Sequence, residues 1–180
     1  MRLISTLTLC FTLAGNVSLL AQNLPYPANA TFFTGQPPSL LSADTLETSV
    51  GYPYPSYYFS FNVPVKSPES VGSVSIAPQE NGDPIVFDFS KTTAFQGTRQ
   101  KQGTPISIKS TTQDPTTKVI TVSFAQPVPP NTTFTVSMRP YSNPQFAGTY
   151  IFRVQIYPAG ANPIGLDLGV GSFSFYSWGR

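Results

Sequence analysis

Hydrophobic and polar residues alternate with a period of two along most of the chain. Tyr57, Phe59, Phe61 and Val63 fall on one face of such a run, and polar side chains fall between them. This alternation predicts short β-strands with one buried and one solvated face, as antiparallel sheets have. Such alternating or paired apolar positions occur in the ranges 57–63, 74–76, 85–89, 106–109, 120–124, 134–138, 150–156 and 173–175.

Turn-forming residues separate these runs. Asn81-Gly82-Asp83 predicts a tight hairpin, and Pro127 to Asn131 divides two further runs. The best helical signal is a single turn at residues 67–70, with Ser67 as N-cap and Pro68 at the first helical position. We therefore predict an all-β fold over residues 51–180: an antiparallel β-sandwich, immunoglobulin-like or jelly-roll-like. A closed barrel is the competing architecture.

Residues 1–21 have the pattern of a secretory signal peptide. One positive charge, Arg2, precedes an apolar run that ends in small residues, and cleavage is expected after Ala21, with Ala30 as an alternative. Serine, threonine and asparagine interrupt the run, which disfavours an uncleaved membrane anchor. We expect an exported protein, periplasmic, in the cell envelope or extracellular, with no transmembrane segment after signal removal.

Residues 22–50 differ from the rest of the chain. They contain four prolines and show little alternation, which predicts an extended leader. Leu40, Leu41 and Leu46 are the side chains expected to dock this leader on the sandwich.

The residue types exclude much site chemistry. The chain has no histidine, and its one cysteine, Cys10, lies in the predicted signal. The exported domain therefore has no imidazole base, no thiolate, no disulfide and no nitrogen or sulfur ligands for zinc, and we expect no cofactor. Its charges are scattered around a net value of +2, which disfavours nucleic-acid binding.

Several short motifs together resemble a known family. They comprise the stretch from Val122 to Val136 around Pro129-Pro130-Asn131, followed by Asn143-Pro144, Gly148 to Phe152 and Tyr157 to Gly160. Tyr57 to Phe59, Thr93 to Gly97 and Gly169 to Tyr176 complete the pattern. It resembles the cyanobacterial exported domain-of-unknown-function family numbered 2808, over roughly 40–177. The resemblance implies an exported single-domain β-protein and carries no catalytic residues. Asn131 stands where the family more often has glycine, and asparagine also accepts positive φ.

An aromatic run, Gly51 to Tyr58, is the most suggestive surface element. Tyr52 and Tyr54 stand beside prolines and Tyr58 ends the same run, and rigid tyrosines can stack on sugar rings or on a proline-rich partner. Trp178 is a possible extension of this ligand surface, as are Tyr141 and Tyr176. The alternative is that Tyr52 and Tyr54 only cover an edge of the sandwich.

Three weaker signals have structural explanations that the sequence favours. Glu80 to Asp83 with Asp88 offers oxygen ligands for calcium, but a hairpin explains the same residues. Arg139 and Arg153 either pair with carboxylates and disfavour edge-to-edge pairing of the sheet, or present a guanidinium to an anionic polysaccharide. The acids lie mostly in turns, with no evident catalytic pair: Asp44, Glu47, Glu69, Glu80, Asp83, Asp88, Asp114 and Asp167.

These observations favour a non-catalytic function. We expect an exported β-sandwich of the cell envelope or cell surface that acts by binding or assembly, with an envelope polysaccharide or a protein as partner. The alternative is an envelope carbohydrate-active hydrolase that uses paired carboxylates, since glycosidases need neither histidine nor cysteine. The sequence specifies neither the ligand nor the oligomeric state.

Overall fold

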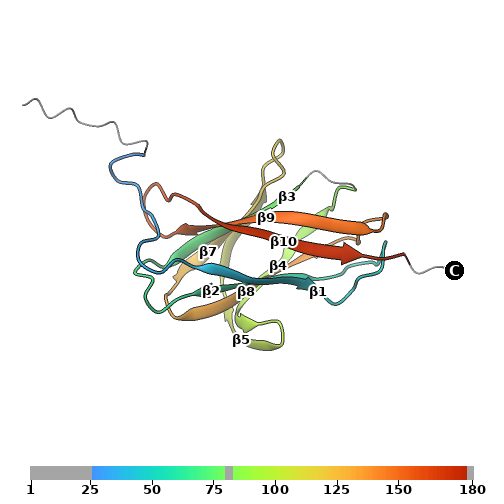
Figure 1. The fold of residues 1–180 in the computed structure, drawn as a ribbon, viewed down its shortest axis with the longest axis horizontal. Helices are drawn as coiled ribbons and strands as arrows, with labels where there is room; N and C mark the ends of the chain where they lie inside the picture. The colour runs from blue at the N-terminus through green and yellow to red at the C-terminus, as the bar shows by residue number, and fades with distance from the viewer. Residues whose placement is uncertain (1–25, 80–82, 178–180) are drawn as a thin grey trace, which may run out of the picture.

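The computed structural model describes residues 26–79 and 83–177, and these form two five-stranded β-sheets packed face to face (Figure 1). Sheet I has the strand order β1-β2-β8-β4-β5, and sheet II has the order β10-β9-β3-β7-β6. The strands are β1 (Ser39–Thr45), β2 (Tyr57–Val63), β3 (Val71–Pro78), β4 (Phe87–Thr98), β5 (Lys101–Ile106), β6 (Ile108–Gln113), β7 (Ile120–Val128), β8 (Thr132–Pro140), β9 (Gly148–Pro158) and β10 (Leu166–Phe175).

All ladders between these strands are antiparallel, which confirms the predicted all-β antiparallel sandwich. The prediction of a helical turn at 67–70 is wrong: those residues follow a turn closed by a hydrogen bond from Ser67 N to Pro64 O. Among the described residues, no helix is long and apolar enough to cross a membrane.

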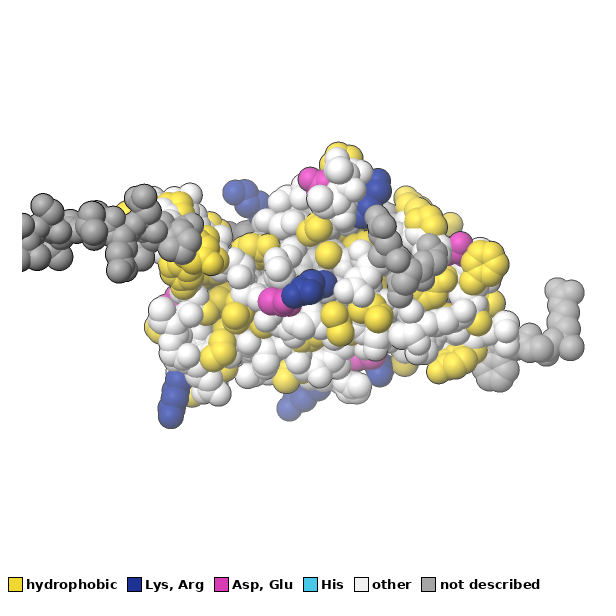
Figure 2. Space-filling view, turned by 45° about the horizontal axis from the view of Figure 1, so that its top comes forward, with side chains coloured by type: hydrophobic (Ala, Val, Ile, Leu, Met, Phe, Trp, Pro, Cys, Tyr) yellow, Lys and Arg dark blue, Asp and Glu magenta, His cyan; other side chains and the backbone are white. Residues whose placement is uncertain are grey.

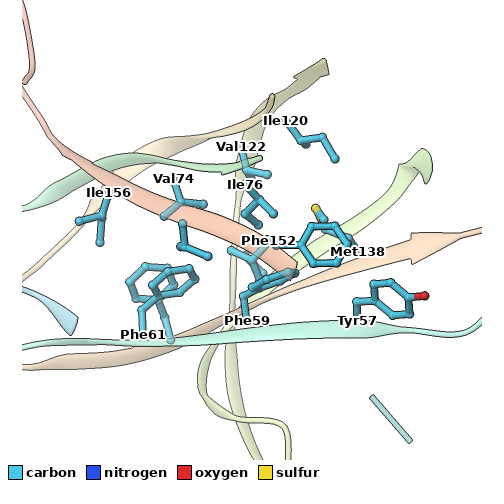
Figure 3. Close-up of a cluster of buried hydrophobic side chains, with 14 of the residues drawn as sticks. Tyr57, Phe59, Phe61, Val74, Ile76, Ile120, Val122, Met138, Phe152 and Ile156 are labelled. Atoms are coloured by element: carbon cyan, nitrogen blue, oxygen red, sulfur yellow. The ribbon is translucent and has the colours of Figure 1, made fainter. Parts of the chain in front are cut away.

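The core lies between the sheets and is built from the predicted inward faces (Figure 3). Tyr57, Phe59 and Phe61 of β2 are fully buried, and Phe152 and Ile156 of β9 face them from sheet II. Tyr57 is one of several stacked rings, with its centroid 4.5 Å from that of Phe173. Because the one cysteine lies outside the described residues, their stability rests on this apolar burial and on the backbone ladders.

Strand β1 was not predicted by the alternation pattern and lies within the range 22–50. A bulge between Leu40 and Ser42 breaks the period of two, which explains why the strand is hard to recognise in the sequence. Leu40 packs against the core as expected, whereas Leu41 and Leu46 are exposed.

Several connections pass from one sheet to the other. Strands β3 and β4, which flank Asn81-Gly82-Asp83, lie in sheets II and I and do not pair as the predicted hairpin requires; Asn81 and Gly82 themselves lie outside the described residues. The proline segment before Asn131 likewise crosses between sheets, and Asn131 has the positive φ (59°) that we expected. The predicted strand at 106–109 divides at Ser107, where the chain passes from β5 in sheet I to β6 in sheet II.

The two ends of the sandwich are formed by different loops. Residue 26 lies at one end, and the β1–β2 loop (46–56) and the β8–β9 loop (141–147) lie at the opposite end (Figure 1). The end of β10, followed by Tyr176, lies beside these two loops, because Ser49 and Tyr176 form an isolated β-bridge. This opposite end carries Tyr52, Tyr54, Tyr141 and Tyr176, four of the aromatic residues singled out in the sequence.

Candidate binding surface

Five exposed aromatic side chains gather at the end of the sandwich opposite residue 26. We call this set the aromatic end; it consists of Tyr52, Tyr54, Tyr141, Phe146 and Tyr176. Their exposed fractions range from 38% to 67%. Figure 2 shows hydrophobic side chains grouped at this end, on the right of the view. Leu46 and Val86 are also exposed there, so the end is apolar as well as aromatic.

Backbone hydrogen bonds join the loops that carry these side chains. Asn143 N donates to Tyr52 O at 2.9 Å, and Tyr54 N donates to Tyr141 O at 3.0 Å. The residue at the end of β10, Tyr176, is bound to the β1–β2 loop by two further backbone hydrogen bonds. Three segments distant in sequence therefore form one continuous platform.

A buried asparagine ties the platform to the core. Asn143 is 1% exposed, and its Nδ2 donates to the carbonyl oxygens of Glu47 and Ser49, each at 2.8 Å. Its Oδ1 accepts a hydrogen bond of 2.8 Å from the hydroxyl of Tyr57. Burial, with a smaller effect of Tyr150, raises the pKa of Tyr57, so its hydroxyl stays protonated and remains a donor.

Tyr54, Tyr141 and Arg139 form a compact group within this surface. The rings of Tyr54 and Tyr141 meet edge to face with centroids 6.4 Å apart, and the guanidinium carbon of Arg139 lies 5.6 Å from the Tyr54 centroid. Tyr54 has φ of 50°, a conformation that side-chain-bearing residues rarely adopt outside turns. Tyr54 is thus held in a fixed position between an aromatic and a cationic neighbour.

The structure separates the residues of the predicted ligand surface. Tyr52 and Tyr54 belong to the aromatic end, whereas Tyr58 lies on the outer face of β2, where the guanidinium carbon of Arg99 is 5.9 Å from its ring centroid. Trp178 lies outside the described residues. Sequence reasoning missed Phe146 and Asn143 as site residues, although the Asn143-Pro144 pair was already part of the family pattern.

The two arginines of interest have different environments. Arg153 forms an ion pair with Asp167 across β9 and β10, so its charge is neutralised locally. Arg139 lies opposite Asp88 in the ladder of β8 and β4, but the described residues place no carboxylate oxygen within 4.0 Å of it. Of the two, only Arg139 fits the expectation of a guanidinium available to a ligand.

The described carboxylates are used singly and locally. Asp44 pairs with Arg99 at 2.6 Å, Asp88 accepts hydrogen bonds from Ser90, and Asp83 accepts one from the backbone of Gln145. Glu80 to Gly82 of the possible calcium loop lie outside the described residues. In the ranges 26–79 and 83–177, no three acidic, cysteine or histidine side chains come together as a metal site.

Three carboxyl groups have lowered pKa values. The backbone N–H groups of Thr117 and Thr116 lower the pKa of Asp114. The backbone N–H of Gly169 and the side chain of Arg153 lower the pKa of Asp167. Desolvation opposes the shift at Glu69, but hydrogen bonds from Thr34 leave its pKa lowered. No group of this kind is suited to act as a general acid near neutral pH.

These shifts predict acid sensitivity. Each carboxyl takes up a proton more readily in the unfolded chain, so the unfolded state binds more protons as pH falls. We expect the free energy of unfolding to be level above the ordinary values of 4.5 for Glu69 and 3.8 for Asp114, and to decrease below them. Urea titrations from pH 6 to about 3 measure this; Asp114→Asn should give a shallower decrease, and an unchanged profile would contradict the assignment.

A hollow of about 560 Å³ lies beside β9 and is lined mainly by apolar side chains such as Ile85, Val86 and Ile151. Its lining includes Gln79 and Asp83, the residues on either side of the undescribed residues 80–82.

Comparison with solved structures finds several chains that are similar to this one. BslA, described as a bacterial hydrophobin, is 15% identical with a TM-score of 0.50, over 81% of this chain and 98% of that chain. A collagen-binding domain from a Staphylococcus aureus adhesin is 11% identical (TM-score 0.40; 80% and 99%). An immunoglobulin-like protein from Nocardia farcinica is also 11% identical (TM-score 0.46; 77% and 99%). At these identities the likeness concerns the fold alone.

A search of curated proteins found no match. The model of one family, described as "Protein of unknown function (DUF2808)", matches residues 30–175. This range covers both sheets and the loops of the aromatic end, and it confirms the resemblance seen in the short motifs. The chain belongs to the DUF2808 family.

Proposed function

We propose that this protein is an exported, non-catalytic β-sandwich of the cell envelope or cell surface that binds a partner through the aromatic end. The observation that carries the proposal is the set of five exposed aromatic side chains on loops fixed by Asn143. Clustered apolar exposure on a soluble domain is typical of an interaction surface. Rigid aromatic rings bind with little loss of conformational entropy, so the fixed loops favour binding further.

Export is supported by the signal-like pattern of residues 1–21. BslA, which has a similar fold, is described as a hydrophobin, and this makes assembly at an interface a relevant variant of the same proposal. For partner binding and for assembly alike, the aromatic end is the surface that makes the contact.

The alternative of a carbohydrate-active hydrolase has less support. A glycosidase needs two carboxyl groups about 5–10 Å apart, one of them with a raised pKa. Asp44, Asp83, Asp88 and Asp167 each contact their own separate partner, and the shifted carboxyl pKa values are all lowered. These local roles account for the four named aspartates without catalysis.

Co-sedimentation with envelope fractions tests the proposal. The purified exported protein is mixed with peptidoglycan, surface polysaccharide or outer-membrane vesicles, and the bound fraction is measured against concentration. We expect saturable binding to one fraction, and a loss of about tenfold or more in affinity for the Tyr54→Ser/Tyr141→Ser variant, because two aromatic contacts are removed.

A matched control comes from the opposite end of the sandwich. Tyr26 and Phe32 also form an exposed edge-to-face pair, with centroids 5.2 Å apart. The Tyr26→Ser/Phe32→Ser variant should bind like the unchanged protein. If both variants lose affinity equally, or if no fraction binds, the aromatic end is not the binding surface.

A further inference from the structure

A second hollow, of about 390 Å³, lies on the outer face of sheet I next to the aromatic end. We call it the sheet groove. It is lined mainly by Tyr58 of β2, Phe95 and Lys91 of β4, Gln102 of β5, and Ser137 and Arg139 of β8. The volume falls within the range typical of small-molecule sites. The residues come from four adjacent strands, so the sheet itself positions them.

The hairpin between β4 and β5 helps to form the groove. Arg99, at the tip of this hairpin, reaches past β8 and β2 to Asp44 of β1 and covers the ring of Tyr58 on the way. Gly97 makes the tight turn possible: its φ is 89°, and a Cβ there would overlap the carbonyl oxygen of Lys101. Phe95 is 8% exposed but is not part of the core cluster, so the groove has an apolar side outside the core.

The groove carries unneutralised positive charge. Lys91 and Arg139 line it, and within the part of the chain that the structure describes neither has a carboxylate oxygen within 4.0 Å. Asp88, the nearest acid in the ladder, uses its Oδ1 to accept bonds from Ser90 N at 3.0 Å and Ser90 Oγ at 2.6 Å. Arg99 is already paired with Asp44. In a chain with only 10% charged residues, two free cations in one hollow indicate an anionic ligand.

The other lining groups indicate which anion. Tyr58 offers an aromatic surface for the apolar face of a sugar ring, and Ser137 and Gln102 offer a hydroxyl and an amide for sugar hydroxyl groups. A guanidinium binds carboxylate or sulfate through two parallel hydrogen bonds. The combination fits an acidic sugar better than an inorganic anion, which has no use for the aromatic wall.

Arg139 connects the groove with the aromatic end, because it lines the groove while its guanidinium lies over the ring of Tyr54. We propose that the sheet groove binds an acidic unit of a polysaccharide, with Lys91 and Arg139 holding its carboxylate or sulfate, and that the neighbouring units of the same glycan lie on the aromatic end. This rests on the proposed binding function and names the class of ligand.

Three soluble polymers test the proposal by titration calorimetry on the purified exported protein. Polygalacturonate supplies carboxylates, dextran sulfate supplies sulfates, and dextran is the neutral control. We expect binding to at least one acidic polymer, weakened by added salt, and none to dextran. The Lys91→Gln/Arg139→Gln variant should lose about tenfold or more in affinity, because two charge-assisted contacts are removed. Which acidic polymer binds more tightly identifies the charged group.

A charge-matched control separates the groove from general attraction. Lys66 and Lys109 are exposed and do not line the groove. The Lys66→Gln/Lys109→Gln variant should retain full affinity, and thermal unfolding confirms that both variants are folded. Equal losses in both variants, equal binding of dextran, or no binding of either acidic polymer would overturn the proposal. Binding of envelope fractions that depends on Tyr54 and Tyr141 but not on Lys91 and Arg139 would overturn it and leave the proposed function intact.

Discussion

Replacing Phe152 with alanine is expected to lower the free energy of unfolding by about 4 kcal/mol. Phe152 is 1% exposed at the centre of the sandwich. Its ring meets those of Phe173 at 5.4 Å and Phe59 at 5.9 Å between centroids, so it contacts both sheets. The truncation removes buried apolar surface and leaves a cavity that the rings around it cannot fill without moving.

Phe146 provides the control for this prediction. The same substitution there removes a side chain that is 67% exposed in the β8–β9 loop, and we expect a change within about 0.5 kcal/mol. Urea denaturation of the unchanged protein and both variants measures the two values. Similar losses for Phe146→Ala and Phe152→Ala would mean that the aromatic core does not dominate stability.

Alternation in the sequence predicts part of this fold. The run from Tyr57 to Val63 predicts both a strand and which of its faces is buried. Successive side chains of a strand point to opposite faces of the sheet, so a period of two marks the face that packs on the core. Strand β1 cannot be recognised in this way, because the bulge between Leu40 and Ser42 interrupts the period of two. Alternation also does not specify which strands pair, so it does not show that β3 and β4 lie in different sheets.

The candidate surfaces were predictable only in part. Tyr52 and Tyr54 could be singled out because prolines flank them, but their proximity to Tyr141 depends on two loops more than 80 residues apart in the chain. The sequence does not predict which arginine lacks a carboxylate partner. Arg139 and Arg153 both lie on or at the end of predicted strands, but only Arg153 is paired with Asp167 in the fold. Long-range geometry decides both points.

Replacing Asn143 with alanine is expected to cost about 3 kcal/mol and to weaken partner binding, although no aromatic side chain is changed. The substitution removes the acceptor of the Tyr57 hydroxyl and the donors to the carbonyl oxygens of Glu47 and Ser49. The Tyr57 hydroxyl and the Glu47 carbonyl are costly to leave unpaired where water cannot replace the lost partner, whereas Ser49 O keeps a hydrogen bond from Tyr52 N. The β1–β2 loop then loses its side-chain hydrogen bonds from the β8–β9 loop and keeps only the backbone ones, so the aromatic end becomes less ordered before a ligand arrives.

Tyr57→Phe separates the two effects of this substitution. It removes only the hydroxyl, while both hydrogen bonds donated by Asn143 Nδ2 remain, so we expect a cost of about 1–2 kcal/mol and unchanged partner binding. Urea denaturation measures the stability of both variants, and limited proteolysis within residues 46–56 measures the order of the loop. If Asn143→Ala binds envelope fractions as tightly as the unchanged protein, the aromatic end does not depend on this tie. Binding that falls only in Asn143→Ala, with faster cleavage of the loop, would show that a buried amide in the core prepares the surface for its partner.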